Sequence, residues 1–297
     1  MSQNQSRDKA VRDGQAVVPD SAGPAVTPDG RPGGQSAFPG GQLTFMTTVR
    51  SEWIKFWSIR STWVTLIVLV VVIIGFGLLM MSTAKAPPPG GTPVYVTNSV
   101  QLGLMLGNVV MAILAALTIT NEYRSGEIRL SLLAVPNRWY LLGAKGLIVA
   151  VVAFVVSLVS MYVVVLGSWP FIRTFGVDDR FTADGIRVVV GAALAITLGA
   201  VMSLAIGALV RSTAAAVGIA VIILFVLPAV LGFIPVSWIT QASHYTIANS
   251  LRGLASLPAQ VNPANGVFSF GKACWVTAAW AVIPFVAAGV LLRRRDA

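Results

Sequence analysis

One stretch of the sequence has almost the residue pattern of a phosphate-binding loop. GVFSFGKA, residues 266–273, matches G-x-x-x-x-G-K-[ST] except at its last position, where Ala273 lacks the hydroxyl group that would hold a magnesium ion. In that motif a buried strand leads into the glycines, and a helix start faces the phosphates. No such strand is predicted before Gly266, and the following helix is a predicted membrane span whose start faces outward. We therefore expect no ATP site in this chain.

Acidic residues are the next candidates for chemistry. They are Asp8, Asp13, Asp20, Asp29, Glu52, Glu122, Glu127, Asp178, Asp179, Asp184 and Asp296. Every one lies in a predicted tail, loop or span edge, whereas carriers driven by protons or sodium usually keep an ionisable group at membrane depth. This placement argues against an ion-coupled carrier, although sodium sites built only from carbonyls and hydroxyls stay open.

Other groups that could carry out catalysis are scarce. Cys274 is the single cysteine and His244 the single histidine, which excludes an internal disulfide and a cysteine-based zinc cluster. No nucleophile with a neighbouring base and no set of metal ligands is visible in the sequence. We expect no catalytic, cofactor-binding or metal-binding residue, and we interpret both Cys274 and His244 as structural.

A densely charged stretch, TNEYRSGEIRLSLLAVPNRW, interrupts the apolar sequence between Thr120 and Trp139. Gly126 permits a sharp turn, and Pro136 ends the short helix that follows. The apolar residues of this helix recur on one face and are Ile128, Leu132 and Val135. Such a helix suits the docking of a soluble partner, since its apolar face can enter a groove while its charges fix the orientation. An ordinary cytosolic loop resting on lipid headgroups has the same pattern.

The elements that must position these residues are membrane helices. Hydrophobic residues make up 56% of the 297-residue chain and charged residues 11%, whereas soluble domains average roughly 25% charged residues. A bilayer core of about 30 Å needs around 20 apolar helical residues. Six segments reach this length, at about 62–81, 100–120, 144–167, 186–210, 213–233 and 273–292. We predict an all-α polytopic membrane protein whose residues 62–297 form six transmembrane helices.

The placement of lysine and arginine predicts the orientation of these helices. With the amino terminus in the cytosol, fifteen of the 21 basic residues fall in inner segments and six in outer segments. Both termini are then cytosolic, and so is the charged stretch. This distribution also accounts for the formal net charge of +10, so we expect no nucleic-acid partner.

The residues before the first span divide into two parts. Residues 1–42 are rich in Gly, Pro, Ser, Asp and Gln, which predicts a disordered cytosolic tail. Residues 43–61 place apolar and aromatic side chains at helical spacing, which predicts an amphipathic helix in the membrane interface, in contact with lipid. The residues expected to anchor it are Trp53, Lys55, Phe56, Trp57 and Arg60, and its polar face holds Thr48, Ser51, Lys55 and Ser58. A plain basic flank to the first span is the alternative.

Three segments together resemble a known family. They are SEWIKFWSIRSTW (51–63), NEYRSGEIRLSLLAVPNRWYLLGAK (121–145) and LVRSTAAAVG (209–218). Their order and spacing among six spans are similar to those of the permease subunits of type-2 ABC exporters. The resemblance covers about Leu43 to Arg295, and Glu127 departs from the small hydroxyl residue expected after the glycine.

The resemblance implies a permease subunit of an ATP-driven exporter in the cell membrane. It would pair with a second copy or a related permease and form the substrate path as a dimer, driven by two separate cytosolic ATPase subunits that hold ATP and magnesium. By the same resemblance, the loop between the second and third spans couples the permease to the ATPase. The residues of this loop are Glu122, Tyr123, Arg124, Gly126, Glu127, Ile128, Arg129, Leu132, Val135, Pro136 and Arg138. The sequence does not indicate which substrate is transported or which residues line its path.

Two other functions stay open at this point. One is an ion-driven secondary transporter, against which the placement of the acids argues. The other is a non-transporting membrane anchor or immunity protein that binds a partner through the same charged loop.

Overall fold

The computed structural model describes residues 44–83, 95–128, 137–173, 182–234 and 236–294. Within these ranges the chain is helical apart from turns and one isolated β-bridge between Asn262 and Val267. The prediction of an all-helical protein is therefore confirmed.

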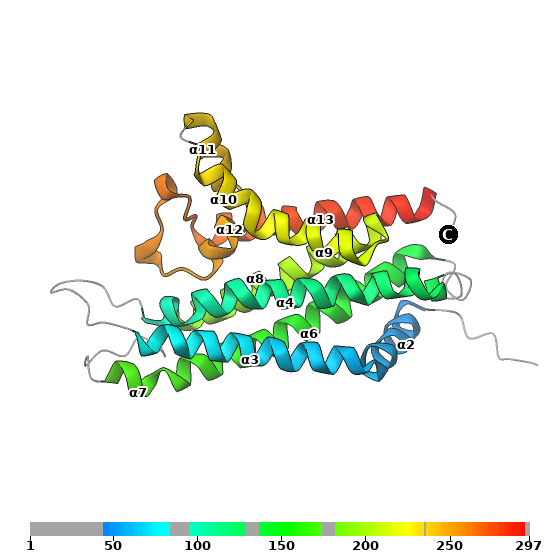
Figure 1. The fold of residues 1–297 in the computed structure, drawn as a ribbon, viewed down its shortest axis with the longest axis horizontal. Helices are drawn as coiled ribbons and strands as arrows, with labels where there is room; N and C mark the ends of the chain where they lie inside the picture. Colours follow the sequence, from blue (N-terminus) through cyan, green and yellow to red (C-terminus); the bar gives the residue numbers. More distant parts are fainter. Residues whose placement is uncertain (1–43, 84–94, 129–136, 174–181, 235, 295–297) are drawn as a thin grey trace, which may run out of the picture. The chain divides into compact units, whose positions relative to one another are not determined.

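Six helical segments in the described ranges are long and apolar enough to cross a membrane (Figure 1). They are α3 (Arg60–Ser82), α4 (Tyr95–Ser125), α6 (Arg138–Gly167) with the short α7 (Trp169–Ile172), α8 (Ala183–Val210), a composite fifth segment, and α13 (Phe270–Arg294). The fifth segment consists of α9 (Thr213–Val221), η2 (Ile222–Val226) and α10 (Leu227–Gly232). The prediction of six spanning helices is confirmed.

Helix α8 is the central helix of the bundle. It packs against α4, α6 and α13, and 78% of the residues in its most apolar stretch are buried. Glycines let its neighbours approach closely, because a Cβ atom on Gly207 would lie 2.9 Å from the Ile119 side chain of α4. A Cβ atom on Gly199 would collide with the Asn108 side chain, also on α4. The small residues of α8 therefore set how near α4 can lie.

Helix α2 (Phe45–Ser58) lies at one end of the bundle, where α4 and α13 also end (Figure 1). The Thr44 side chain caps its first turn by accepting from the Thr47 N–H at 3.4 Å. The helix stops at Ile59, whose backbone is extended, and α3 starts at the next residue. Helix α2 packs mainly on α6. We call this end of the bundle the α2 end.

The opposite end of the bundle carries two short helices between the fifth and sixth spans. These are α11 (Ser237–His244) and α12 (Ile247–Leu254), and two 3₁₀ turns follow them, η3 (Pro258–Gln260) and η4 (Pro263–Asn265). Helix α12 packs on α13 and α8 through its apolar face, where Ile247 and Leu254 are fully buried. We call this end the α12 end.

The fifth span is the least buried of the six, and a π-helical turn interrupts it. Only 17% of the residues in its apolar stretch are buried. In η2 the Leu227 N–H donates to the carbonyl of Ile222, five residues earlier. Pro228 has no N–H to offer the carbonyl four residues before it, so the shifted pattern falls where a regular α-helix would lose a hydrogen bond. Pro284, in contrast, lies inside α13 without ending that helix.

Candidate functional site

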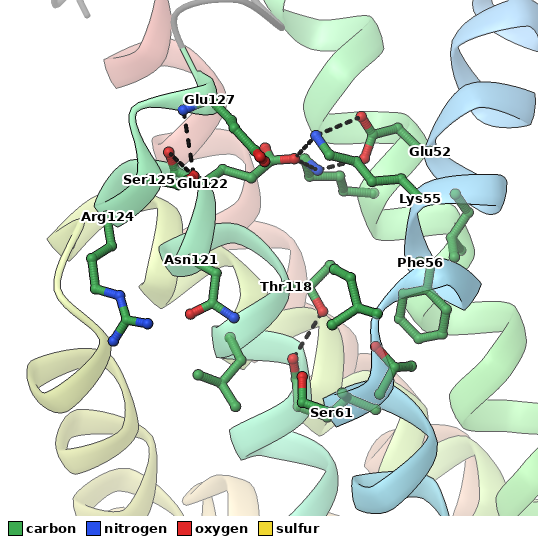
Figure 2. Close-up of a pocket in the computed structure, with 16 residues that line it drawn as sticks. Glu52, Lys55, Phe56, Ser61, Thr118, Asn121, Glu122, Arg124, Ser125 and Glu127 are labelled. Atoms are coloured by element: carbon green, nitrogen blue, oxygen red, sulfur yellow. Dashed lines mark hydrogen bonds and ion pairs between the residues drawn. The ribbon is translucent and has the colours of Figure 1, made fainter.

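Four charged side chains from three helices meet at the α2 end (Figure 2). Lys145 of α6 donates from Nζ to Oε1 of Glu122 on α4 at 2.8 Å, and also to Oε2 of Glu52 on α2. Lys55 of α2 donates to the same Oε1 of Glu122, and its Nζ lies 4.0 Å from Oε1 of Glu52. We call these four residues the charge cluster.

The charge cluster is buried to a degree that is unusual for charged side chains. Lys145 is 2% exposed, Glu122 4% and Glu52 7%. Removing such charges from water costs roughly several kcal/mol per ion. Opposite charges and hydrogen bonds must offset this desolvation cost. Two carboxylates and two ammonium groups balance here, which allows the three helices to bring them together.

Lys55 is the most exposed member of the charge cluster, and its surroundings favour the charged form. Burial lowers its pKa, but the hydrogen bond and negative charge of Glu122, with smaller contributions from Glu52 and Glu127, raise the pKa more. The net result is a pKa above the usual 10.5. Lys55 is therefore charged at neutral pH and can pair with Glu122 and Glu52.

Local sequence explains how each helix places its charge. Glu52 and Lys55 are three residues apart, so they share one side of α2. Asn137 starts α6 by accepting from the Trp139 N–H at 3.1 Å, and Lys145 follows about two turns later. Helix α4 continues to Ser125 and so carries Glu122 in its last turns.

This last point corrects part of the sequence interpretation. The segment from Thr120 onward was expected to be a loop and its acids to lie at a span edge. The structure instead keeps residues 120–125 helical and buries Glu122 inside the protein. Burial of Glu52 in the helix before the first span was also not expected. Charge pairing with Lys145 and Lys55 explains both differences, because it offsets the cost of burial.

A cavity of about 280 Å³ adjoins the charge cluster (Figure 2). Its lining combines the four cluster residues with Phe56, Ile59, Ser61, Thr62, Leu114, Leu117, Thr118, Asn121, Arg124, Ser125, Glu127 and Ile148. The second carboxylate oxygen of Glu122, Oε2, accepts no hydrogen bond from the described residues. The cavity is thus charged at the cluster, polar where Ser61 and Thr62 of α3 border it, and apolar at side chains of α2, α4 and α6 such as Phe56, Leu114 and Ile148.

Helix α4 ends in a tight turn at Gly126. Its φ angle is +75°, a left-handed conformation that favours glycine, and no atom lies close to where a Cβ would be. Arg124 and Glu127 are exposed beside this turn, whereas Ile128 is buried. The predicted turn at Gly126 is therefore present, four residues after the buried Glu122.

The remaining predicted coupling residues divide into three groups. Arg129, Leu132, Val135 and Pro136 lie outside the described residues. Arg138 is the first residue of α6 and donates to the Leu292 carbonyl of α13. Tyr123 is half-buried, and the Arg211 guanidinium lies 5.2 Å from the centre of its ring.

A second polar contact joins the same end of α4 to the turn between α8 and α9. Thr213 donates from Oγ1 to Oγ1 of Thr120 at 2.9 Å. Arg211, in this turn, is the one residue other than glycine with a positive φ angle (+59°) in the described ranges. The last turns of α4 therefore contact α2, α6 and the start of the fifth span.

The residues expected to anchor α2 in the membrane interface occupy different surroundings. Trp53 and Arg60 are exposed, Trp57 is half-buried, Phe56 is buried, and Lys55 belongs to the charge cluster. The inward face of α2 consists of Thr48, Glu52 and Phe56. The prediction that Thr48 lies on a polar face opposite the aromatic residues is wrong, because Thr48 is buried on the same face as Phe56. Lys55 pairs with Glu122 because the protein interior supplies an acidic partner. Interfacial placement of α2 stays a prediction.

Sequence reasoning missed two members of the charge cluster. Glu52 was placed only among the acids of predicted tails, loops and span edges, and Lys145 was named only as the end of the segment 121–145. A usable signal exists, since acids and lysines stand within a few turns of the predicted inner ends of three helices. What the sequence lacks is the pairing, because residues 52, 122 and 145 are far apart along the chain.

Comparison with known proteins places this arrangement in a family. Residues 48–227, more than half of the chain, match the family model described as ABC-2 family transporter protein. The match runs from α2 to the start of α10 and includes the whole charge cluster. The chain belongs to the ABC-2 transporter family. The resemblance to type-2 ABC permeases is thereby confirmed.

Membership of the ABC-2 family defines the general role of the chain. It is a multi-pass membrane permease, the membrane-embedded component of an ABC transporter, and this family works with ATPase partners. Such permeases are transport components and typically not enzymes. A comparison with curated proteins finds no match, so no relative narrows the substrate.

Proposed function

We propose that this ABC-2 permease is a subunit of an ATP-driven exporter, and that the charge cluster transmits movement of the coupling loop into the bundle. One observation carries the proposal. The last turns of α4 lead into the predicted coupling loop, and Glu122 ties these turns to both α2 and α6.

The buried ion pairs make this connection stiff. If α4 moved away from α2 and α6, Glu122 would leave Lys55 and Lys145, and buried charges would lose their partners. Separating a buried pair costs about 3–5 kcal/mol. A push on the end of α4 therefore moves the three helices together more readily than it separates them.

The fifth span is the element best suited to respond. The Thr213–Thr120 hydrogen bond and the contact between Arg211 and Tyr123 link its start to α4. Few of its residues are buried, and its π turn already departs from a regular helix, so a shift disturbs little packing. We infer that movement of the α4 end biases the fifth span between inward-open and outward-open arrangements.

The proposed assembly follows the orientation argument. The α2 end faces the cytosol, both termini and the 1–42 tail lie there, and α2 lies in the membrane interface against lipid. Exposed basic residues at this end support the orientation: Arg50, Arg60, Arg124, Arg293 and Arg294. In the cell membrane two permease chains, identical or related, form the substrate path, and two cytosolic ATPase subunits bind ATP and magnesium.

The test uses the full chain co-expressed with its ATPase and reconstituted in proteoliposomes. Two substitutions act on the exposed end of α4 without touching the charge cluster: Gly126→Pro, which forbids the φ of +75°, and Arg124→Glu. Both variants should insert and keep the thermal midpoint within a few degrees. Permease-dependent stimulation of ATP hydrolysis should fall at least about tenfold, as expected for the loss of roughly 1.4 kcal/mol of coupling.

Arg50→Glu is the matched control, since Arg50 is an exposed cation at the same end of the bundle. It should leave the stimulation unchanged. Normal stimulation in both α4 variants would refute the coupling assignment. If no ATPase co-purifies with the wild-type chain, the membrane-anchor function replaces the exporter.

A further inference from the structure

A second cavity lies at the α12 end, away from the charge cluster. Its volume is about 480 Å³, within the range of roughly 300–1,000 Å³ that small-molecule sites occupy. Its lining comes from the end of α3, the first half of α4, the fifth span and α12: Met80, Gln101, Leu102, Leu104, Met105, Asn108, Leu224, Phe225, Pro228, Ala229, Ala248, Asn249, Leu251 and Arg252.

The walls of this cavity are mostly apolar, and the polar groups are few. Gln101 and Asn108 stand on α4, about 10 Å apart along the helix, and Asn249 and Arg252 stand on α12. No carboxylate belongs to the lining, and Arg252 makes no ion pair within the described ranges. The lining therefore carries one positive charge, on the exposed Arg252, and no carboxylate.

Asn108 is the deepest polar group of the lining. It is 2% exposed, and its Nδ2 donates to the Leu104 carbonyl at 3.2 Å. Its Oδ1 accepts no hydrogen bond from the described residues. Leaving a buried acceptor unpaired destabilises the protein, so such groups are uncommon, and we interpret this one as the partner of a donor that the described residues do not supply. Gly199 keeps room for this side chain, since a Cβ there would collide with it.

The wall contributed by the fifth span is the part of that span with altered backbone. Leu224 and Phe225 lie in the π turn, and Pro228 follows it. Short π-helical turns are often found at functional sites, because the extra residue redirects side chains. Two residues of the altered turn therefore line the cavity, and one of them, Leu224, is also part of the buried hydrophobic core.

From these features we infer that the cavity at the α12 end binds an amphiphile with an apolar chain, a hydrogen-bond donor and an anionic group. The chain lies along Leu224 and Phe225, the donor pairs with Asn108, and the anion pairs with Arg252. A cationic amphiphile is disfavoured because the lining offers no acid. That this amphiphile is the transported substrate rests on the proposed exporter function. That it binds in the cavity does not depend on that function.

Binding can be measured by equilibrium dialysis on the full-length chain in lipid nanodiscs, with empty nanodiscs as the blank. The probe is N-octanoylglycine, which has an amide N–H and a carboxylate. N-Octanoylsarcosine differs by a methyl group that removes the donor, and octyltrimethylammonium reverses the charge. We expect saturable binding of the first, about three- to tenfold weaker binding of the second, and no saturable binding of the third.

Variants test each assigned contact. Asn108→Ala should bring the two acyl amino acids to the same affinity, a change in preference that a general structural effect would not produce. Arg252→Glu should weaken N-octanoylglycine about tenfold. The matched control is Lys272→Glu, the same charge change at an exposed residue in the first turn of α13, which packs on α12 but does not line the cavity. Ala229→Phe should block binding by filling the cavity, and it is tolerated because Ala229 is exposed.

Absence of binding above the blank, or an equal loss for both acyl amino acids in Asn108→Ala, would overturn the inference. Nanodiscs with and without phosphatidylglycerol then identify the source of the ligand. If phosphatidylglycerol competes with the probe, the site exists and its occupant is a bilayer lipid. If phosphatidylglycerol does not compete, the site exists and its occupant is a soluble compound. The binding assay contains no ATPase, so a negative binding result does not refute the exporter proposal. Likewise, if the ATPase test fails, binding can still be measured.

Discussion

At the α2 end of the bundle, the charged groups inside the protein pair with one another, whereas at the α12 end the polar groups face a cavity. Glu122 is shared by two lysines, and each charge of the cluster has an opposite charge beside it. Asn108 has an acceptor with no donor, and Arg252 has no ion pair within the described ranges. One end is arranged to hold helices together, and the other keeps polar groups available for a ligand.

The two ends of α4, the helix that reaches both ends of the bundle, therefore have different roles. Its final turns are fixed to α2 and α6, and its first half borders the cavity with the fifth span. The charge cluster fixes one end of α4, whereas the fifth span, which borders the cavity at the other end, has few buried residues and can move more easily. Removing a charged side chain should therefore cost far more stability at the α2 end than at the α12 end.

The largest expected effect comes from Lys145→Ala. It leaves Glu52 and Glu122 buried with only the partly exposed Lys55 as a partner. Removing one partner of a buried pair costs about 3–5 kcal/mol, which should appear as a large drop in the thermal unfolding midpoint of the purified protein. Arg252→Ala at the other end should stay within about 0.5 kcal/mol of wild type. Similar unfolding midpoints for the two variants would contradict the proposed difference between the α2 end and the α12 end.

A smaller effect is expected from Thr213→Val. It removes the hydrogen bond to Thr120 while keeping the shape of the side chain. The stability loss should be about 0.5–1.5 kcal/mol, and the variant should also weaken ATPase stimulation if the fifth span follows α4. Thr65→Val on exposed α3 is the control, since its hydroxyl bonds only within its own helix. Equal stimulation in both variants would show that this contact carries no movement.

Pro228→Ala tests the cavity wall. Restoring a backbone N–H allows the π turn to relax toward α-helix, so stability should change by less than about 1 kcal/mol. Binding of N-octanoylglycine should fall, because Leu224 and Phe225 would turn away from their present positions. The measurements are thermal unfolding and dialysis on one preparation. A large loss of stability with unchanged binding would mean that the wall is packed like the α2 end.

The smallest effect concerns pH. Because the folded-state pKa of Lys55 is raised, its contribution is complete below the unfolded value near 10.5 and is lost as the pH rises through the folded pKa. Lys55 is partly exposed, so we expect only about 0.5 kcal/mol. In a plot of the free energy of unfolding against pH, Lys55→Met should remove that part of the alkaline destabilisation. Between pH 6 and 9 its curve should run parallel to that of the wild type. Identical alkaline curves would exclude Lys55 as a titrating member of the cluster.

The sequence predicted the spans well because the signal is local. Each apolar run is itself a helix of bilayer length, as α8 (Ala183–Val210) illustrates, and the turn at Gly126 follows from one residue type. The interior of the bundle was predicted less well. Glu52 sits among aromatic and basic residues, and nothing in its neighbourhood indicates that it pairs with Lys145, 93 residues away.

By itself the sequence determined the helical class, six spans, the family resemblance and the charged stretch, since hydropathy, turn residues and motif order are read along the chain. Only the tertiary structure decided that Glu122 is buried, that α2 turns its acid inward, and that Asn108 borders a cavity with Arg252. The physical reason is that pairing and burial depend on which helix faces lie against each other. Helix packing brings together residues that are distant in sequence, and hydropathy does not encode those contacts.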